Sequence, residues 1–159
     1  DGVLVNLLYH LDWLGQGTQS FRSTGFSVEF GVENGAECNT RFLRERYRWS
    51  TVMFDASFEN KTIGLHRAVI TPGNVNDIFT AHGVPRTFDV LSIDIDYNDY
   101  WVWSAIDNQR FRPRILVVEY NSHLSASTRQ TVRENDGLSR WDGTSSYFGA
   151  SLGALAQLG

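Results

Sequence analysis

The chain has 159 residues, a length that fits one domain with a core of its own. Its 18 acidic side chains outnumber its 14 basic ones, which gives a formal net charge of −4 at pH 7. This balance argues against a nucleic-acid backbone as the main partner, because such binding depends on neutralising phosphates. No apolar run approaches the roughly 18 residues of a membrane span, so we expect none.

Leucines recur at helical spacing near the start of the chain, which predicts an amphipathic helix over residues 2–14. Further along, apolar segments bounded by turn residues predict five strands, at 27–32, 51–54, 67–71, 88–95 and 114–120. Helical patterns separate the strands at 38–47, 59–65, 74–83 and 98–106, and a small-residue helix is predicted between 146 and 158. Asn74 is a candidate N-cap and Gly83 a candidate stop for one of these helices.

This alternation of strands and helices predicts an α/β fold with right-handed crossovers and a mainly parallel sheet. The runs VLSI and ILVV, in the fourth and fifth strands, are apolar on both faces, as expected for strands covered by helices on each side. We expect residues 1–24 to form an N-terminal helix and a connection. Residues 25–159 are expected to form a Rossmann-like, doubly wound domain.

Polar residues gather where the predicted strands end, which is the edge where open parallel sheets bind ligands. They are Glu29 in the first strand, Asp55 after the second, Asp94 and Asp96 after the fourth, and Glu119 and Asn121 after the fifth. Carboxylates a few ångströms apart raise one another's pKa unless a cation or hydrogen-bond donors intervene. The cluster therefore predicts a partner: ligand hydroxyls, a positively charged ligand or a divalent metal.

Glu29, Gly31 and Gly35 form the pattern E-x-G-x-x-x-G, which predicts a tight turn where the backbone approaches a ligand. No lysine follows as in a P-loop, and two glutamates in the turn would repel a phosphate. Asp55 lies about twenty residues further on, where a carboxylate can accept the hydroxyls of a ribose. The combination predicts a nucleoside-bearing cofactor. The alternative is a glycine-rich turn that needs positive φ and binds nothing.

Several of these residues also have structural interpretations. Asp96 can N-cap the helix at 98–106, and the aromatic residues of that helix fit a buried face. Glu119 can pair with Arg112 or Arg114. The four histidines show no metal-ligand spacing.

The stretches VEFGVENGAECNTRFL, FDVLSIDIDYNDYWVWSAI and RPRILVVEYN resemble class I S-adenosylmethionine-dependent methyltransferases, and most of all a branch near the FkbM-like methyltransferases. The resemblance covers most of the chain from residue 25 onward. It implies a sheet of order 3-2-1-4-5 followed by two further strands, which have no counterpart in this sequence. We therefore expect a methyltransferase-like domain that is incomplete at its C-terminal end.

The resemblance also implies roles for individual residues. The cofactor-binding set would be Glu29, Gly31 and Gly35 around the methionine part, Asp55 at the ribose, Asn74 near the adenine and Asp94 beside the methyl group. The expected catalytic residues are Asp94, Asp96 and Glu119, as a base or as orienting groups for the acceptor. Oxygen ligands suit Mg²⁺, and a metal set like that of catechol-type members would comprise Asp94, Asp96 and Asn121.

The expected activity is transfer of the methyl group of S-adenosylmethionine to an oxygen or nitrogen of a small acceptor. A first alternative is a methyltransferase-like domain without activity, serving as a binding module or an assembly subunit. Glu33, which replaces a middle glycine, favours that alternative, and an exposed edge at the fifth strand would pair with another chain or an absent segment. A second alternative is a glycosyltransferase, in which Asp94-Ile95-Asp96 serves as a metal-binding D-x-D motif.

Overall fold

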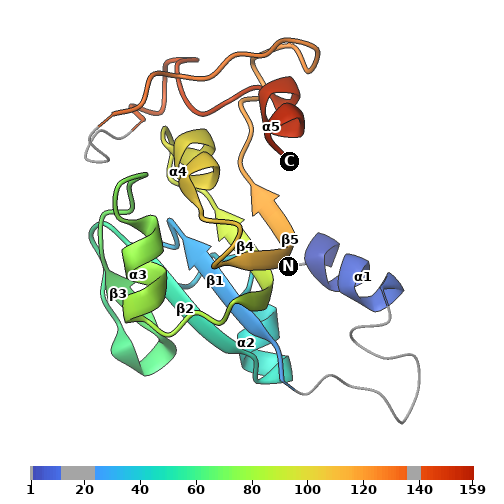
Figure 1. Ribbon diagram of the computed structural model, residues 1–159, viewed down its shortest axis with the longest axis vertical. Helices are drawn as coiled ribbons and strands as arrows, with labels where there is room; N and C mark the ends of the chain where they lie inside the picture. Colours follow the sequence, from blue (N-terminus) through green and yellow to red (C-terminus); the bar gives the residue numbers. More distant parts are fainter. Residues whose placement is uncertain (1, 12–23, 136–140) are drawn as a thin grey trace.

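The computed structural model describes residues 2–11, 24–135 and 141–159. Its centre is a five-stranded sheet in which all neighbouring strands are parallel and the order is β3-β2-β1-β4-β5 (Figure 1). The strands are β1 (Phe26–Phe30), β2 (Ser50–Asp55), β3 (Leu65–Arg67), β4 (Thr87–Ile93) and β5 (Arg112–Val118). The predicted α/β, Rossmann-like sheet and its strand order are confirmed.

Helices cover both faces of the sheet, so the domain has three layers (Figure 1). One face carries α3 (Val75–Ala81) and α4 (Asp99–Ala105), and the other carries α1 (Gly2–His10) and α2 (Arg41–Tyr47). Side chains alternate along β5, as the period of a strand requires. Leu116 and Val118 pack on the α3–α4 side, whereas Ile115 and Val117 pack on the α1–α2 side. The apolar run ILVV is therefore used on both faces, as predicted.

A last helix, α5 (Leu152–Leu158), packs through Ala154 and Leu155 against Tyr100 and Trp103 of α4. It starts later than the predicted residue 146, because Ser151 is its N-cap and accepts a hydrogen bond from the Ala154 amide at 3.2 Å. α5 joins the long segment after β5 to the rest of the domain.

The predicted N-terminal helix is present as α1, which ends at His10. Residues 12–14 of the predicted range lie outside the described residues. Leu4 and Leu8 are buried in one cluster with Leu43 and Trp49, so α1 packs on the domain and does not stand apart from it.

The third strand was predicted at 67–71, and this range is wrong, because β3 ends at Arg67. The Asn74 side chain explains the difference. Its carboxamide accepts a hydrogen bond from the Thr71 amide and donates one to the Val69 carbonyl, both at 2.8 Å. These bonds hold the backbone after β3 in a loop. Asn74 occupies the N-cap position of α3 but makes no side-chain capping bond.

The helix predicted at 59–65 is a single 3₁₀ turn, η1 (Lys61–Ile63). Asn60 starts it by accepting a hydrogen bond from the Thr62 amide, and Gly64 ends it with a φ of 78°. The other predicted elements are present with ends that differ by one to three residues, for example at the start of α2.

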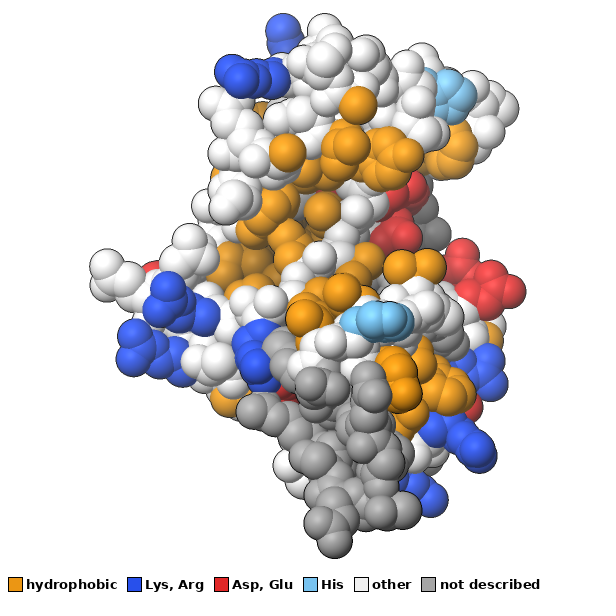
Figure 2. Space-filling model, turned by 90° about the vertical axis from the view of Figure 1, so that its right-hand side faces the viewer, with side chains coloured by type: hydrophobic (Ala, Val, Ile, Leu, Met, Phe, Trp, Pro, Cys, Tyr) orange, Lys and Arg blue, Asp and Glu red, His pale blue; other side chains and the backbone are white. Residues whose placement is uncertain are grey.

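β5 forms one edge of the sheet and pairs only with β4 among the described residues. Figure 2 shows the molecule from the β5 side, where apolar side chains run across the hollowed middle of this face. Pairing of this edge with a further strand stays a prediction. None of the helices in the described part of the chain combines the length and the apolarity that crossing a membrane requires.

Candidate functional site

A cavity of about 580 Å³ opens at the carboxyl edge of the sheet. Its walls are the segments that follow β1, β2, β3 and β4, together with Asn135 from the later part of the chain. The ionisable side chains that line it are all acidic: Glu33, Glu37, Asp55, Asp94 and Asp96. Of the predicted strand-end acids, Asp55, Asp94 and Asp96 line this cavity, and no arginine, lysine or histidine among the described residues lines it.

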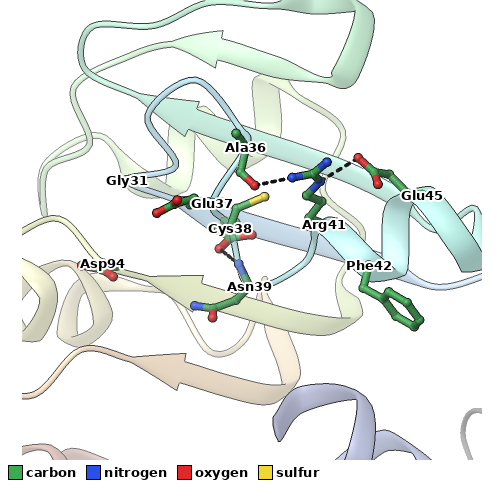
Figure 3. A pocket seen from close by; sticks show the side chains of 10 residues that line it. Gly31, Ala36, Glu37, Cys38, Asn39, Arg41, Phe42, Glu45 and Asp94 are labelled. Carbon is green, nitrogen blue, oxygen red and sulfur yellow. Dashed lines mark hydrogen bonds and ion pairs between the residues drawn. The ribbon is translucent and has the colours of Figure 1, made fainter. Parts of the chain in front are cut away.

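A second cavity of about 490 Å³ adjoins the first and shares Gly31, Glu37 and Asp94 with it (Figure 3). Its one basic side chain, Arg41, is already engaged, because it binds the Ala36 carbonyl and Glu45. Burial raises the pKa of the Cys38 thiol, which also lines this cavity, to about 11. At neutral pH this thiol is protonated and is no nucleophile.

Gly31 directly follows β1. Its backbone lies against the backbone of Asp94, which directly follows β4. Its φ is 73°, a conformation that side-chain-bearing residues rarely adopt. A Cβ at this position would overlap the carbonyl oxygen of Asp94. Gly35, with a φ of 80°, is similarly tight, since a Cβ there would lie 2.7 Å from the Ile63 side chain. The predicted glycine turn is thus a close approach of two backbones beside the cavity.

Glu29 is buried and anchors the start of α2. One carboxylate oxygen accepts the Asn39 amide at 2.6 Å, and the other accepts the Thr40 amide at 3.0 Å and the Thr40 hydroxyl at 2.6 Å. These bonds delay the start of α2 to Arg41, instead of the predicted residue 38. Glu29 lines the second cavity, but its hydrogen bonds give it a structural role in the strand-to-helix turn.

Asp55 lines the main cavity at the end of β2, as predicted. Its Oδ2 accepts the Glu33 amide at 2.9 Å, and its Oδ1 accepts the amides of Ser57 and Phe58 at 2.7 and 3.1 Å. The carboxylate therefore ties the glycine turn to the loop after β2. Each oxygen can accept more than one hydrogen bond, so the side chain keeps capacity for a ligand hydroxyl.

Asp94 and Asp96 follow the end of β4, and both line the main cavity. The strand ends at Ile93, and Asp96 has a φ of 73°, so strand alternation does not govern where these side chains lie. Asn98, and not Asp96, occupies the N-cap position of α4. Reduced hydration and the charge of Asp96 raise the pKa of Asp94 above its usual value.

Glu119 belongs to the same group of acids. Reduced hydration and the charges of Asp94, Asp99 and Asp96 raise its pKa to about 8. A side-chain hydrogen bond joins Glu119 to Asp94, so protonated Glu119 donates to the Asp94 carboxylate. The alternative ion pair with an arginine is not the one observed, because Arg114 lies 3.2 Å from Asp89.

Asp99 was not predicted as a site residue, although it completes the group. It is fully buried in the first turn of α4, and its Oδ1 accepts the Ile95 amide at 2.9 Å. Burial raises the pKa of Asp99 to about 6, and its charge acts on Glu119. The sequence signal was the spacing Asp94, Asp96, Asp99, which resembles an ordinary acidic helix start.

This arrangement predicts a specific pH dependence of stability. The pKa of Glu119 rises from 4.5 to about 8 on folding, so the folded state holds this proton where the unfolded chain has lost it. The free energy of unfolding should therefore decrease as pH rises from about 4.5 to about 8. In Glu119→Gln this decrease should be smaller by about 1 kcal/mol, a figure reduced for solvent screening of a half-buried group. Urea denaturation at several pH values measures the difference, and parallel curves for both proteins would contradict it.

Four predicted residues line neither cavity: Gly35 and Glu119, described above, and Asn74 and Asn121. The Asn74 carboxamide holds the loop whose residues 68–70 line it. Asn121 is buried, its amide donates to the carbonyls of Ser146 and Phe148, and its oxygen accepts the His123 amide at 2.9 Å. Within the described ranges, no group of three or more His, Cys, Asp or Glu side chains is arranged to hold a metal.

Asn98 and Asn135 were missed by the sequence analysis. Both line the main cavity, and the Asn98 carboxamide donates to the Asn135 carbonyl and accepts from the Asn135 amide, both at 3.1 Å. The Trp101 indole adds a bond to the Val132 carbonyl at 2.9 Å. These bonds fasten the segment after β5 over the start of α4. No local pattern could have found a contact between residues so far apart in the sequence.

The fold and the cavity define an α/β domain with an acid-lined cavity at the carboxyl edge of its sheet. No family model matches the sequence, and comparisons with curated proteins and with solved structures found no match either.

Proposed function

We propose that this domain binds S-adenosylmethionine and transfers its methyl group to an oxygen or nitrogen of a small acceptor. The observation that carries the proposal is the cavity at the carboxyl edge, where the described lining residues include Gly31 and five acids but no basic side chain. A wall of this charge disfavours phosphates and favours a cationic, phosphate-free ligand.

The residues present suit such a cofactor in three respects. Gly31 lets the backbone after β1 pack against the Asp94 carbonyl, so that the ends of β1 and β4 lie together at the cavity that both residues line. Asp55, after β2, retains acceptor capacity for a ribose hydroxyl. Phe58 and Ile70 supply apolar surface on the same wall for a base.

When bound, S-adenosylmethionine would supply a methyl carbon whose bond to sulfur breaks, leaving the electron pair on sulfur, as the bond to the acceptor forms. Asp94 and Asp96 face the cavity and would orient the acceptor and take its proton. Because the pKa of Asp94 is raised, its carboxylate is a stronger base than an ordinary aspartate. Glu119, hydrogen-bonded to Asp94, would hold that carboxylate in position.

Calorimetry with S-adenosylmethionine, whose sulfonium carries the positive charge, tests the proposal on the 159-residue chain. We expect saturable binding, and we expect Asp94→Asn to weaken it by about tenfold, since one charged contact is lost. Asp77→Asn on the exposed surface of α3 removes the same charge elsewhere and should leave the affinity unchanged. Absence of binding by the folded protein would rule the proposal out.

A second candidate is a domain that keeps the fold and binds without chemistry, as a binding module or a subunit. The hydrogen bonds that already engage Asp55, and Glu33 at a φ of 47° inside the glycine turn, favour it. The exposed edge at β5 gives such a subunit a place to pair. Binding of the cofactor without methylated product across a broad panel of acceptors would support this candidate.

A further inference from the structure

Two histidines lie against each other, although they are far apart in the sequence. His66 belongs to β3 and His82 is the C-cap residue of α3, and their ring centroids are 4.3 Å apart with an angle of 60° between the rings. β3 and α3 follow each other along the chain, and α3 runs back beside the strand (Figure 1). We call these two residues the histidine pair. Spacing in the sequence does not reveal it, because the path of the chain through α3 brings the two rings together.

Phe54 supports both rings of the histidine pair. It is the neighbour of His66 in the register between β2 and β3, so the two side chains lie on the same face of the sheet. The Phe54 ring centroid is 5.8 Å from that of His66 and 4.9 Å from that of His82. Phe54 is fully buried, and the His82 amide donates to the Ile78 carbonyl at 3.0 Å. Strand, helix end and supporting ring therefore hold the two imidazoles close together.

The ring nitrogens of the histidine pair are unengaged and reachable from solvent. In the part of the chain that the structure describes, neither imidazole has a hydrogen bond or an ion pair. Both residues are partly exposed, and their nitrogens are not among the buried polar atoms that lack a partner. An ion in solution can therefore approach both nitrogens without displacing a protein group.

Imidazole selects the kind of ion. Neutral imidazole nitrogens are ligands of Zn²⁺, Ni²⁺ and Cu²⁺, whereas Mg²⁺ and Ca²⁺ prefer oxygen. Metal–nitrogen bonds of about 2.0–2.1 Å place the centroids of two imidazoles on one tetrahedral ion roughly 5 Å apart. The observed separation of 4.3 Å is close to this value, so small rotations of the two side chains would let both bind one ion.

The protein supplies two ligands at this place. No group of three or more His, Cys, Asp or Glu side chains is arranged to hold a metal within residues 2–11, 24–135 and 141–159, so water would complete the coordination. The histidine pair lines neither of the two cavities, so it is separate from the proposed methyl-transfer site. The alternative is an aromatic contact alone, which would contribute about 0.5–1.5 kcal/mol to stability and bind nothing.

We propose that the histidine pair binds one divalent transition-metal ion of the class that prefers imidazole, with Zn²⁺ and Cu²⁺ as its representatives. The bound ion joins β3 to the end of α3. It stabilises the folded chain, because folding places the two imidazoles within reach of one ion and the unfolded chain does not. This inference is independent of the proposed methyl transfer.

Calorimetry with zinc chloride tests the inference on the 159-residue chain without an added histidine tag. At about pH 7.5 an ordinary imidazole is neutral and free to bind. We expect saturable binding of one ion per chain and a melting temperature that rises with zinc concentration. Magnesium chloride should not raise it in the same way, since Mg²⁺ prefers oxygen ligands. Absence of zinc binding by the folded protein would overturn the inference.

Variants place the binding at the histidine pair. His66→Gln and His82→Gln should each weaken zinc binding by at least about tenfold, because each removes one of the two ligands. His123→Gln is the matched control, since His123 is exposed and its ring lies against Phe148. This control should leave the affinity unchanged. Unchanged affinity in both variants of the pair, with circular dichroism confirming that they are folded, would exclude the site.

A measurement on the unaltered chain covers the case in which a variant does not fold. Cu²⁺ is paramagnetic and broadens the NMR signals of nearby amides. During a copper titration, the amides around His66 and His82 should broaden first. Broadening that begins instead around Asp94 and Asp96 would show that the ion binds the acid-lined cavity, and the inference would fall.

Discussion

Gly31→Ala should destabilise the domain by about 2–5 kcal/mol and remove ligand binding in the main cavity. A φ of 73° costs an alanine about 1–2 kcal/mol, and the added Cβ would overlap the carbonyl oxygen of Asp94. That oxygen belongs to the backbone and cannot move aside as a flexible side chain would, so overpacking adds about 1–3 kcal/mol. Urea denaturation measures the first effect, and calorimetry with S-adenosylmethionine measures the second.

Gly83→Ala is the matched control. Gly83 has a similar φ of 66°, but nothing lies within 4 Å of an added Cβ. This variant should therefore show only the conformational cost, about 1–2 kcal/mol, and keep its ligand binding. Equal losses in the two variants would show that the contact between the ends of β1 and β4 contributes nothing beyond the backbone conformation.

Glu29→Gln should cost about 2–4 kcal/mol, although glutamine has nearly the same shape. Three donors, the amides of Asn39 and Thr40 and the Thr40 hydroxyl, converge on the two carboxylate oxygens. Glutamine replaces one of those oxygens by an NH₂ group, which faces a donor and leaves it unsatisfied in a buried place. Urea denaturation gives the loss of stability. Hydrogen exchange should show faster exchange of the amides at the start of α2.

Glu37→Gln provides the comparison, because Glu37 is an exposed acid in the same turn. Its stability should change by less than about 0.5 kcal/mol. A loss in Glu29→Gln no larger than in Glu37→Gln would mean that the hydrogen bonds of Glu29 do not anchor α2.

The sheet could be predicted because its signals are local and repeated. The alternation of apolar strands with helices implies parallel pairing, and runs such as ILVV report burial on both faces. The positions of Gly31, Asp55, Asp94 and Asp96 followed from the same reasoning, since parallel strands bring their carboxyl ends to one edge.

The failures came from side chains that bind backbone groups. Asn74 turns the chain after β3 into a loop, and Glu29 delays the start of α2. Asn121 has a side chain that could bind a ligand, yet its amide donates hydrogen bonds that hold the segment at residues 146–148. A sequence pattern lists donors and acceptors, but it does not say which of them meet.

The amino-acid sequence by itself determined the layered α/β architecture and the edge where the acids gather, because these depend on periodicity and chain direction. The strand order was an expectation from the family resemblance, which periodicity alone does not supply. Only the tertiary structure decided what each acid does. Asp99 joins Glu119 near Asp94 because β5 pairs with β4 and α4 begins shortly after β4 ends, and Asp55 binds three amides because two loops meet there. Burial and proximity, which change the pKa of a carboxyl group and decide its hydrogen bonds, are properties of the packed chain.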